Sequence, residues 1–386
     1  MKTFCFKLYN SKRNKHLMRL INIAGLIYNH CIALHRRYYR LFGKHIRKFQ
    51  MTKHLVKLKK TKRFAFFRDL DAQAVYDIVF RIDSAYNLFW SNRKRGIKTY
   101  TPRFRKVKRY RSFTMYQQGW KLDEQNGRIR ICKKWYKYFQ SRNIEGKVKT
   151  VTVKRDGLGD IYIYLTCEIQ RDTAEPRTGE IVGFDFGLKK FLTASNGQDI
   201  KSPDFFALNS KIIHIKSRNF FRKKKASNNR ERAYRELIRA YRKMFRQRTD
   251  FHFKTARRLC EQYAVICLET LDLQAIGKRH GRKINSLAFY EFVQTLLYEA
   301  TKTGTKIIFL DRYYPSSQLC HVCGFKNTAL KDERIRSWDC PSCGTHHDRD
   351  RNAAMNILRA GVSALGGEPL SAARFTTSTD SAGTVQ

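Results

Sequence analysis

The sequence predicts an α+β multidomain protein: a β-barrel-like domain interrupted by a helical insertion, followed by an α/β domain that carries a four-cysteine ribbon. Three observations predict this fold. Short runs of alternating apolar and polar residues flank a long helical region in the first half. Apolar, buried-type strands alternate with helical segments in the second half. Two C-x-x-C pairs lie between the last apolar strand and the last helical segment. The 386 residues suffice for two or three domains.

The first half reads as strand, helices and strands again. Residues 3–9 alternate as a strand does, and from about residue 14 to residue 90 the apolar positions keep helical spacing. Alternation returns at 147–154 and 159–168, two strands that we expect to pair across a D-G-L-G turn. We therefore assign residues 1–13 and 112–175 to one β-barrel domain and residues 14–111 to a helical domain inserted in it.

The second half opens with an apolar strand that reaches Asp185 and turns at Gly187. A long helical region is expected over about residues 208–263. Two further apolar strands follow, at 264–268 and 306–310, and the first of them ends at Glu269. The last helix starts near Asp350. These segments predict an α/β domain over 180–317 and 346–360, a cysteine ribbon over 318–345, and a disordered tail over 361–386 that is rich in Gly, Ser, Thr and Ala.

The charge of the chain predicts a polyanionic partner. Lys and Arg number 79 against 32 acidic residues, which gives a formal net charge of +47, and nucleic acid is the usual partner of such charge. Aromatic residues make up 13%, whereas disordered basic tails are poor in them. The sequence thus favours a folded nucleic-acid-binding protein.

Two segments concentrate this charge. Ten of the 21 residues from 91 to 111 are Lys or Arg and none is acidic, while residues 211–258 hold 18 basic and three acidic residues. Basic side chains interleaved with aromatic rings suit phosphate contacts and base stacking, although a solvated charged loop would look similar. The candidate contact residues are Arg103, Phe104, Arg105, Lys106, Lys223, Lys224 and Lys225.

Cysteine spacing predicts a structural zinc site. The two C-x-x-C pairs, sixteen residues apart, have the spacing of a zinc ribbon and supply a closed set of four thiolates: Cys320, Cys323, Cys340 and Cys343. The alternative is that His321, His346 or His347 replaces one cysteine. The other six cysteines lie mostly among apolar neighbours, which is typical of buried thiols in a reducing, intracellular compartment. The N-terminus lacks the apolar core of a signal peptide, and no run of 18 apolar residues predicts a membrane span.

Three acids at the ends of predicted elements suggest a catalytic metal site. Asp185 ends the first strand of a hairpin, Glu269 follows a buried strand, and Asp350 begins a helix, with Asp348 as the competitor for that third place. An RNase H-like sheet would bring such carboxylates together. Mg²⁺ takes oxygen ligands, and two ions about 3.5–4 Å apart activate water and stabilise the leaving oxygen in phosphodiester hydrolysis.

The motifs that carry these residues resemble a known family. The order G-F-D-F-G-L, I-C-L-E-T-L, P-S-S-Q-L-C-H-V-C-G, C-P-S-C-G and D-R-D-R-N-A-A-M-N-I-L is similar to that of the TnpB proteins, RNA-guided DNA endonucleases encoded by insertion sequences and related to type V CRISPR effectors. The motifs cover about residues 181–358. The first departs from the usual pattern by an apolar swap, F-D-F, beside an intact acid.

The resemblance implies a fold, roles and partners. It implies that residues before 175 form wedge and recognition domains, and that Asp185, Glu269 and Asp350 are the RuvC acids that hold Mg²⁺. It also implies a guide RNA from the transposon end and double-stranded target DNA with a short adjacent motif.

The sequence leaves several function classes to compare. We expect an intracellular, prokaryotic RNA-guided endonuclease that is not a membrane protein. The alternatives are a nuclease-inactive RNA-guided repressor, a self-sufficient transposase of RNase H fold, and a structural RNA-binding protein with a zinc ribbon. A repressor would have lost an acid, a self-sufficient transposase would need its own module for recognising DNA ends, and a structural protein would not need acids at three element ends.

Overall fold

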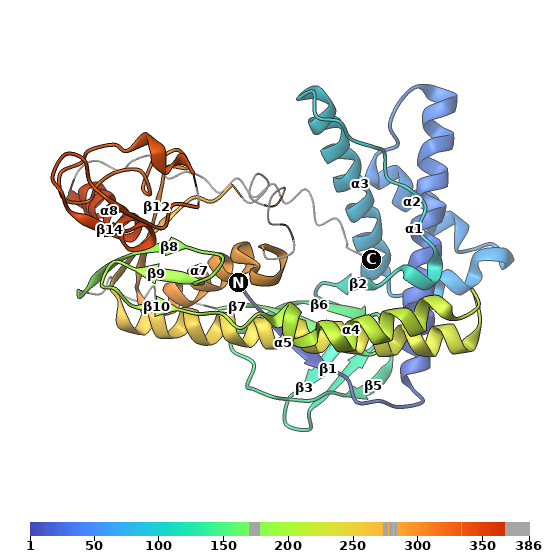
Figure 1. Ribbon diagram of the computed structural model, residues 1–386. Helices are drawn as coiled ribbons and strands as arrows, with labels where there is room; N and C mark the ends of the chain where they lie inside the picture. The colour runs from blue at the N-terminus through green and yellow to red at the C-terminus, as the bar shows by residue number, and fades with distance from the viewer. Residues whose placement is uncertain (170–177, 273–276, 278–280, 282–283, 333, 367–386) are drawn as a thin grey trace. The chain divides into compact units, whose positions relative to one another are not determined.

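The chain divides into two compact units, Met1–Arg171 and Asp172–Gln386. The structure is a computed structural model that describes residues 1–169, 178–272, 277, 281, 284–332 and 334–366. Figure 1 shows the mixed helices and strands of each unit. The mixed α/β, multidomain architecture expected from the sequence is confirmed.

Unit 1 contains a four-stranded antiparallel sheet whose order is β1-β7-β6-β2. The strands are β1 (Lys2–Lys7), β2 (Ser112–Met115), β6 (Lys147–Arg155) and β7 (Ile161–Glu168). β1 pairs with β7 along its whole length, from Lys2 opposite Cys167 to Lys7 opposite Tyr162. The predicted hairpin of β6 and β7 is present. Because β1 joins strands that come more than a hundred residues later, the helices between β1 and β2 are an insertion in the chain of this sheet.

A second, three-stranded sheet has the order β3-β4-β5. Its strands are β3 (Trp120–Asp123), β4 (Arg128–Ile131) and β5 (Lys134–Lys137). A single bridge, Leu8 to Tyr138, links the ends of β1 and β5. Apolar side chains from both sheets share one core, which includes Phe6, Phe113 and Ile129. The described strands therefore form two sheets around a common core, without the closed sheet of a complete barrel.

Helices cover this core. They are α1 (Asn14–Phe42), α2 (Lys48–Leu58) and α3 (Ala72–Lys94), with 3-10 turns at Lys62–Asp69 and Val107–Arg109. By length and composition alone, α1 could cross a membrane. However, 56% of its most apolar 18-residue stretch is buried inside the protein. Leu17, Leu20 and Ile27 are fully buried there. This packing is that of a core helix.

Unit 2 is built on a five-stranded sheet with the order β10-β9-β8-β11-β12. The strands are β8 (Ile181–Phe186), β9 (Leu192–Ala194), β10 (Asp199–Ile200), β11 (Val265–Glu269) and β12 (Lys306–Leu310). β8, β9 and β10 form an antiparallel meander, whereas β11 runs parallel to β8 and β12. β11 and β12 coincide closely with the apolar runs that predicted them.

The helices of unit 2 are α4 (Phe205–Arg222), α5 (Asn228–Gln262), α7 (Phe289–Thr303) and α8 (Arg349–Gly366). The helical region expected at about 208–263 is present as two helices, α4 and α5, with a break between them. Ala226 adopts a positive φ of 65° there, and the Ser227 hydroxyl accepts the Arg230 amide at 3.2 Å. A serine cap thus restarts the helix.

The ribbon lies between β12 and α8. It contains a 3-10 turn at Thr328–Lys331 and the short hairpin of β13 (Ser337–Asp339) and β14 (His346–Asp348). α8 continues to Gly366, beyond the end predicted at residue 360, because Gly361 packs closely against the Cys267 side chain of β11. Residues 367–386 of the expected tail lie outside the described residues.

Candidate nuclease site and metal centre

Asp185 and Glu269 lie side by side because of strand register. β8 and β11 are parallel, and Leu268 pairs with Phe184. One residue further along each strand are Glu269 and Asp185, so the two carboxylates occupy equivalent positions at neighbouring strand ends. Side chains at matched positions of paired strands share a face of the sheet. Both residues are half-buried.

The third acid, Asp350, belongs to the first turn of α8 and acts electrostatically on Asp185. Gly183, two residues before Asp185, lets α8 lie directly against β8, because a Cβ at Gly183 would overlap the Ala354 carbonyl and the Leu358 amide. Asp350 precedes Ala354 by one helical turn. The close packing of helix and strand thus places Asp350 toward the end of β8 that carries Asp185.

The three carboxylates interact electrostatically. Burial raises the pKa of Asp185 well above its ordinary value, and the neighbouring charges of Glu269 and Asp350 raise it further, while Arg349 and Arg336 oppose the rise. Burial raises the pKa of Glu269 to about 7. Two like-charged groups beside a half-buried carboxyl disfavour its ionised form, so a cation among the three groups would offset the repulsion.

Asp348 has a different role from Asp350. Its carboxylate accepts the backbone N–H of Arg351 at 2.9 Å and so caps the first turn of α8. Asp348 is exposed, whereas Asp350 is half-buried and accepts from the Arg336 guanidinium at 3.1 Å. The structure therefore groups Asp350, and not Asp348, with Asp185 and Glu269.

Arg336 is a neighbour of the acids that sequence reasoning missed. The buried Arg349 donates to the carbonyls of Asp332 and Ile335, and its backbone N–H donates to the Arg336 carbonyl at 2.9 Å. These bonds hold the end of the ribbon against the start of α8. No sequence pattern predicts the position of Arg336, because it lies in an irregular part of the ribbon and not in a helix or a strand.

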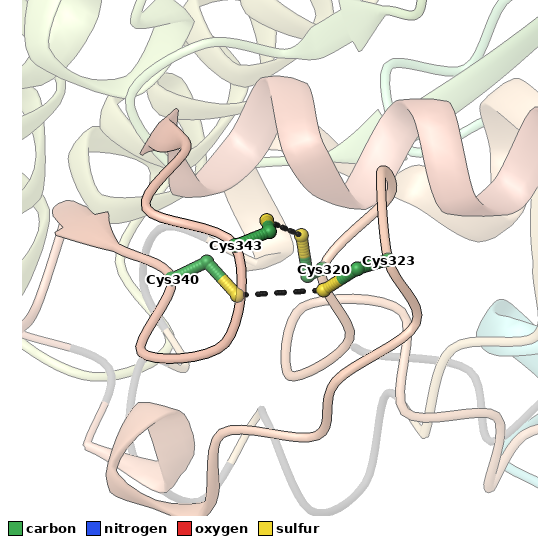
Figure 2. A group of neighbouring side chains, drawn as sticks. All are labelled: Cys320, Cys323, Cys340 and Cys343. Carbon is green, nitrogen blue, oxygen red and sulfur yellow. Dashed lines mark hydrogen bonds between the residues drawn. The ribbon is translucent and has the colours of Figure 1, made fainter.

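The four predicted cysteines form one cluster. Their sulfurs lie within 4.8 Å of one another, with Cys320 and Cys343 3.7 Å apart and Cys323 and Cys340 3.6 Å apart (Figure 2). Four thiolates bound tetrahedrally to zinc at about 2.3 Å would have sulfurs about 3.8 Å apart. The cluster therefore fits a metal ion such as zinc. Within the described part of the chain it is the one such set of three or more ligand side chains, so the three carboxylates are spread more widely.

The histidines near the cluster are not part of that set. His347 contacts one member of the set, with Nε2 3.1 Å from the Cys320 sulfur. His346 contacts Asp339 and His321 contacts Asn352. Hydrogen bonds from the Thr345 hydroxyl and backbone lower the pKa of the Cys343 thiol to about 6, which favours the thiolate that binds metal. The four-cysteine prediction is thus favoured over a histidine replacement.

Two asparagines on α8 connect the ribbon to the helix that carries Asp350. Asn352 donates to the Leu319 carbonyl at 2.6 Å and accepts the His321 amide at 3.0 Å. One turn later, Asn356 donates to the carbonyls of Ser316 and Leu319. Both asparagines are almost fully buried. The two asparagines are four residues apart, a spacing that places them on one face of the helix and that could be read from the sequence.

The predicted contact residues lie in two exposed segments. In unit 1, the Asn29 side chain donates to the Arg105 carbonyl at 2.8 Å and accepts the Arg105 backbone N–H at 2.9 Å, which holds the basic segment against α1. The Arg36 guanidinium lies 4.8 Å from the centre of the Phe104 ring, and Arg103 and Lys106 are exposed. In unit 2, the exposed residues Lys223, Lys224 and Lys225 form the break between α4 and α5.

Comparison with known proteins identifies similar chains. Residues 164–279 match a family described as "Probable transposase", and residues 289–357 match "Cas12f1-like, TNB domain". The first region includes Asp185 and Glu269, and the second includes the four cysteines and Asp350.

Relatives match the chain over most of its length. It is 28% identical over 375 residues to a Streptomyces pristinaespiralis protein named "Putative RNA-guided DNA endonuclease", covering 94% of this chain and 90% of the relative. It is also 28% identical to the Escherichia coli K12 protein "Putative RNA-guided DNA endonuclease InsQ", covering 95% and 93%. A mimivirus "TnpB-like protein L79" is 30% identical over 231 residues, 55% of this chain and 44% of that protein.

A solved structure is similar in fold. Cas12f1, determined with its sgRNA and target DNA, aligns with a TM-score of 0.55 at 17% identity, covering 90% of this chain and 83% of that one. At this identity the likeness concerns the fold.

Proposed function

The chain belongs to the TnpB-like family, and from that premise we propose that it is an RNA-guided DNA endonuclease. The observation that carries the proposal is the grouping of Asp185, Glu269 and Asp350 in a chain whose net charge is +47. A basic protein gains nothing in affinity for nucleic acid from clustered carboxylates. Such a cluster suits metal-dependent hydrolysis.

We infer that unit 2 is an RNase H-like domain of the RuvC type. The support is its sheet, in which an antiparallel meander is followed by two parallel strands on the other side of β8. This order brings the acid of the first strand beside the acid of the fourth. Residues 180–317 and 346–360 would form the domain, with residues 318–345 as an inserted ribbon.

The acids fit divalent cations with oxygen ligands, Mg²⁺ being the ion we propose. The charges of both Glu269 and Asp350 act on Asp185, so we propose that Asp185 would be shared by two ions. Bound there, two ions would supply a metal-activated water and stabilisation of the leaving oxygen. Asp348 would hold the first turn of α8 in place, and Arg349 would fix the adjacent end of the ribbon. The cysteine cluster would hold structural zinc.

We propose that unit 1 grips guide RNA and double-stranded target DNA. Its sheets would form the wedge-like, barrel-like part at residues 1–13 and 112–175, and residues 14–111 the recognition part. The exposed arginines and rings of the segment 91–111 support this assignment. The partners would be an RNA from the transposon end and DNA with a short adjacent motif, in the cytoplasm of a prokaryote. In such systems base pairing with the guide specifies the target.

The test is a plasmid-cutting assay in which the guide sequence varies independently of the protein. Cleavage should require Mg²⁺, a matching RNA and the adjacent motif. Asp185→Ala, Glu269→Ala and Asp350→Ala should each lower cleavage by more than about a hundredfold, because one missing ligand removes the ion arrangement. Binding should persist, because it depends on the basic surface.

Asp348→Ala is the matched control for the third acid. It removes the same group two residues away, and it should cost only the helix cap, about 0.5–2 kcal/mol of stability. If Asp348→Ala abolishes cutting while Asp350→Ala retains it, the assignment of the third acid is wrong. Site-specific cutting by RNA-free protein would exclude guidance and favour the self-sufficient transposase.

A further inference from the structure

A cavity of about 190 Å³ lies in unit 1, and the proposed cleavage chemistry does not use it. It opens between α1, α3 and the basic segment 91–111. Its floor is buried and consists of His35 from α1 with Tyr86 and Phe89 from α3. Its rim is exposed and includes Arg36 and Arg93.

The walls of this cavity are flat rings. His35 stacks on Tyr86 with ring centres 3.6 Å apart and planes 9° from parallel. His45 meets Trp90 edge to face at 4.6 Å. Burial and the nearby His45 lower the pKa of His35 to about 4, so its ring is neutral at physiological pH and suited to stacking. A cavity of about 150 Å³ accepts benzene, so this volume suits a single flat heteroaromatic ring.

Two buried donor groups of residues that line the cavity have no hydrogen-bond acceptor among the described residues. They are the Trp90 indole nitrogen and the Tyr86 hydroxyl. The charge of the Arg36 guanidinium and a hydrogen bond from it to the Tyr86 hydroxyl oxygen oppose the rise in pKa that burial causes, but a guanidinium only donates, so the hydroxyl proton still lacks an acceptor. A buried donor without an acceptor costs free energy, and native proteins rarely leave one so. A ligand that carries a carbonyl oxygen would satisfy these donors.

The rim indicates the rest of the ligand. Arg93 lies 5.8 Å from the Trp90 ring centre, and Arg36 donates to the Pro102 carbonyl at 3.2 Å. None of the residues that line the cavity is acidic. A ring site with cations at its mouth matches a flat base that is joined to a phosphate.

We propose that this cavity holds one unstacked nucleobase of the bound nucleic acid, with its phosphate at Arg36 and Arg93. The inference rests on the proposed function for the presence of nucleic acid, but not on cleavage. Donors outnumber acceptors in the lining, which favours single-ring bases with carbonyl oxygens: uracil or thymine. Extruding a base costs a few kcal/mol in a duplex and little in a single strand, so a single-stranded segment is the expected source.

The experiment is photocrosslinking of the full-length chain with two 12-nucleotide probes of equal charge. One is an oligouridine RNA with a central 4-thiouridine, and the other an oligothymidine DNA with a central 4-thiothymidine. The crosslink should map by mass spectrometry to the peptides that contain His35–Tyr39 or Tyr86–Trp90. Trp90→Leu should lower its yield at least about fivefold, as expected for the loss of one base-stacking contact.

Tyr86→Phe removes only a hydroxyl, so it tests the site without disturbing the packing, and it too should lower the yield. Leu88→Ala changes an exposed side chain of the same helix outside the cavity and should leave the yield unchanged. If the cavity variants lower the crosslink yield of the RNA probe alone, the cavity binds an RNA base. If they lower the yield of the DNA probe alone, it binds a DNA base. If they lower both yields, it accepts a base of either nucleic acid.

A separate measurement distinguishes stacking from charge attraction. The salt dependence of probe binding should be the same for Trp90→Leu as for the unchanged protein, whereas Arg93→Ala should lower the slope by about one phosphate contact. Crosslinks that map only elsewhere, with a yield that neither Trp90→Leu nor Tyr86→Phe alters, would overturn the inference. Because no step measures cutting, that result would leave the endonuclease proposal intact.

Discussion

Single side chains decide which acids of unit 2 can act together. Asp348 and Asp350 are two residues apart, yet one caps α8 and the other lies near Asp185. The sequence left both open, because a strand-to-helix junction has no fixed periodicity. The hydrogen bond from the Arg351 amide to Asp348 settles which carboxylate serves the helix itself.

A buried histidine gives unit 2 a pH-dependent stability. Burial lowers the pKa of His252 to about 4, with a contribution from Arg248, although its hydrogen bond to the Leu287 carbonyl opposes the shift. The unfolded chain binds the proton with a pKa near 6.5. Stability from this group is therefore complete above about pH 6.5 and is lost as the pH falls toward 4.

We predict that lowering the pH from 7 to 5 costs about 1–2 kcal/mol of unfolding free energy through His252. His252→Gln cannot titrate and should remove that part of the pH dependence in urea unfolding curves. His214→Gln, at an exposed position of α4, is the matched control and should leave the dependence as it is. Equal pH dependence in all three proteins would contradict the prediction.

At the scale of elements, the contact between α8 and β8 aligns the site. Gly183 is where the helix touches the strand most closely. We predict that Gly183→Ala lowers stability by about 1–3 kcal/mol, because the added methyl must push α8 outward. Asp350 moves with the helix, so cleavage should fall by more than the unfolding explains. Gly277→Ala, with open space around the position, is the control. Thermal unfolding measures the change in stability and plasmid cutting measures the change in cleavage. Unchanged stability of Gly183→Ala would show that the close contact between α8 and β8 does not limit the packing of the helix.

The ribbon is the second element that positions Asp350. Cys320→Ser should abolish stoichiometric zinc in elemental analysis and open residues 318–348 to proteolysis, since a closed thiolate site supplies folding free energy. Cleavage should drop as well, because Asn352 and Asn356 would lose the carbonyls of Leu319 and Ser316. Asn352→Ala should keep zinc while weakening cutting, and Cys5→Ser should change neither. Purified protein that is folded and free of zinc would refute the zinc assignment.

Strands that consist of a continuous apolar run could be predicted from the sequence, whereas strand register and the end of α8 could not. β11 and β12 follow continuous apolar residues, and Glu269 stands where such a run stops. Parallel register, which sets Glu269 beside Asp185, depends on long-range pairing that no local pattern encodes. The helical extension to Gly366 was missed for a similar reason. Its sequence is rich in small residues typical of tails, but Gly361 is needed for contact with Cys267.

In unit 1, too, the sequence predicted individual strands but not how the sheets are joined. Alternation predicted β6 and β7 and their hairpin, and it also predicted β1. Whether such strands close into one sheet is decided by hydrogen bonds at their edges. Here Leu8 and Tyr138 make a single bridge between the two sheets, while side chains of both fill one core. A shared core without closure has the same apolar pattern as a barrel.

At the scale of the whole molecule, charge governs association. The excess of 79 basic over 32 acidic residues is spread over both halves of the sequence, so many phosphates can be contacted at once. Each neutralised phosphate releases counterions, and the logarithm of the binding constant falls with the logarithm of salt by about 0.9 per contact on duplex DNA. Some lysines are neutralised within the protein and should not take part.

The lysines between α4 and α5 separate these two classes. Lys223, Lys224 and Lys225 are exposed and have no acidic partner among the described residues. Replacing all three with Ala should lower the salt slope of duplex DNA binding by up to about three, if each contacts a phosphate.

The control triple removes equal charge from paired lysines: Lys149 bound to Glu168, Lys216 to Glu236 and Lys254 to Asp250. Since their charges already meet a carboxylate at 2.6–2.8 Å, the slope should change much less. Fluorescence anisotropy from about 50 to 200 mM salt covers the range in which six to ten contacts change affinity about 10³- to 10⁵-fold. Equal slopes for the two triples would show that the α4–α5 turn does not touch the nucleic acid, and that the charge of the chain acts only as a diffuse field.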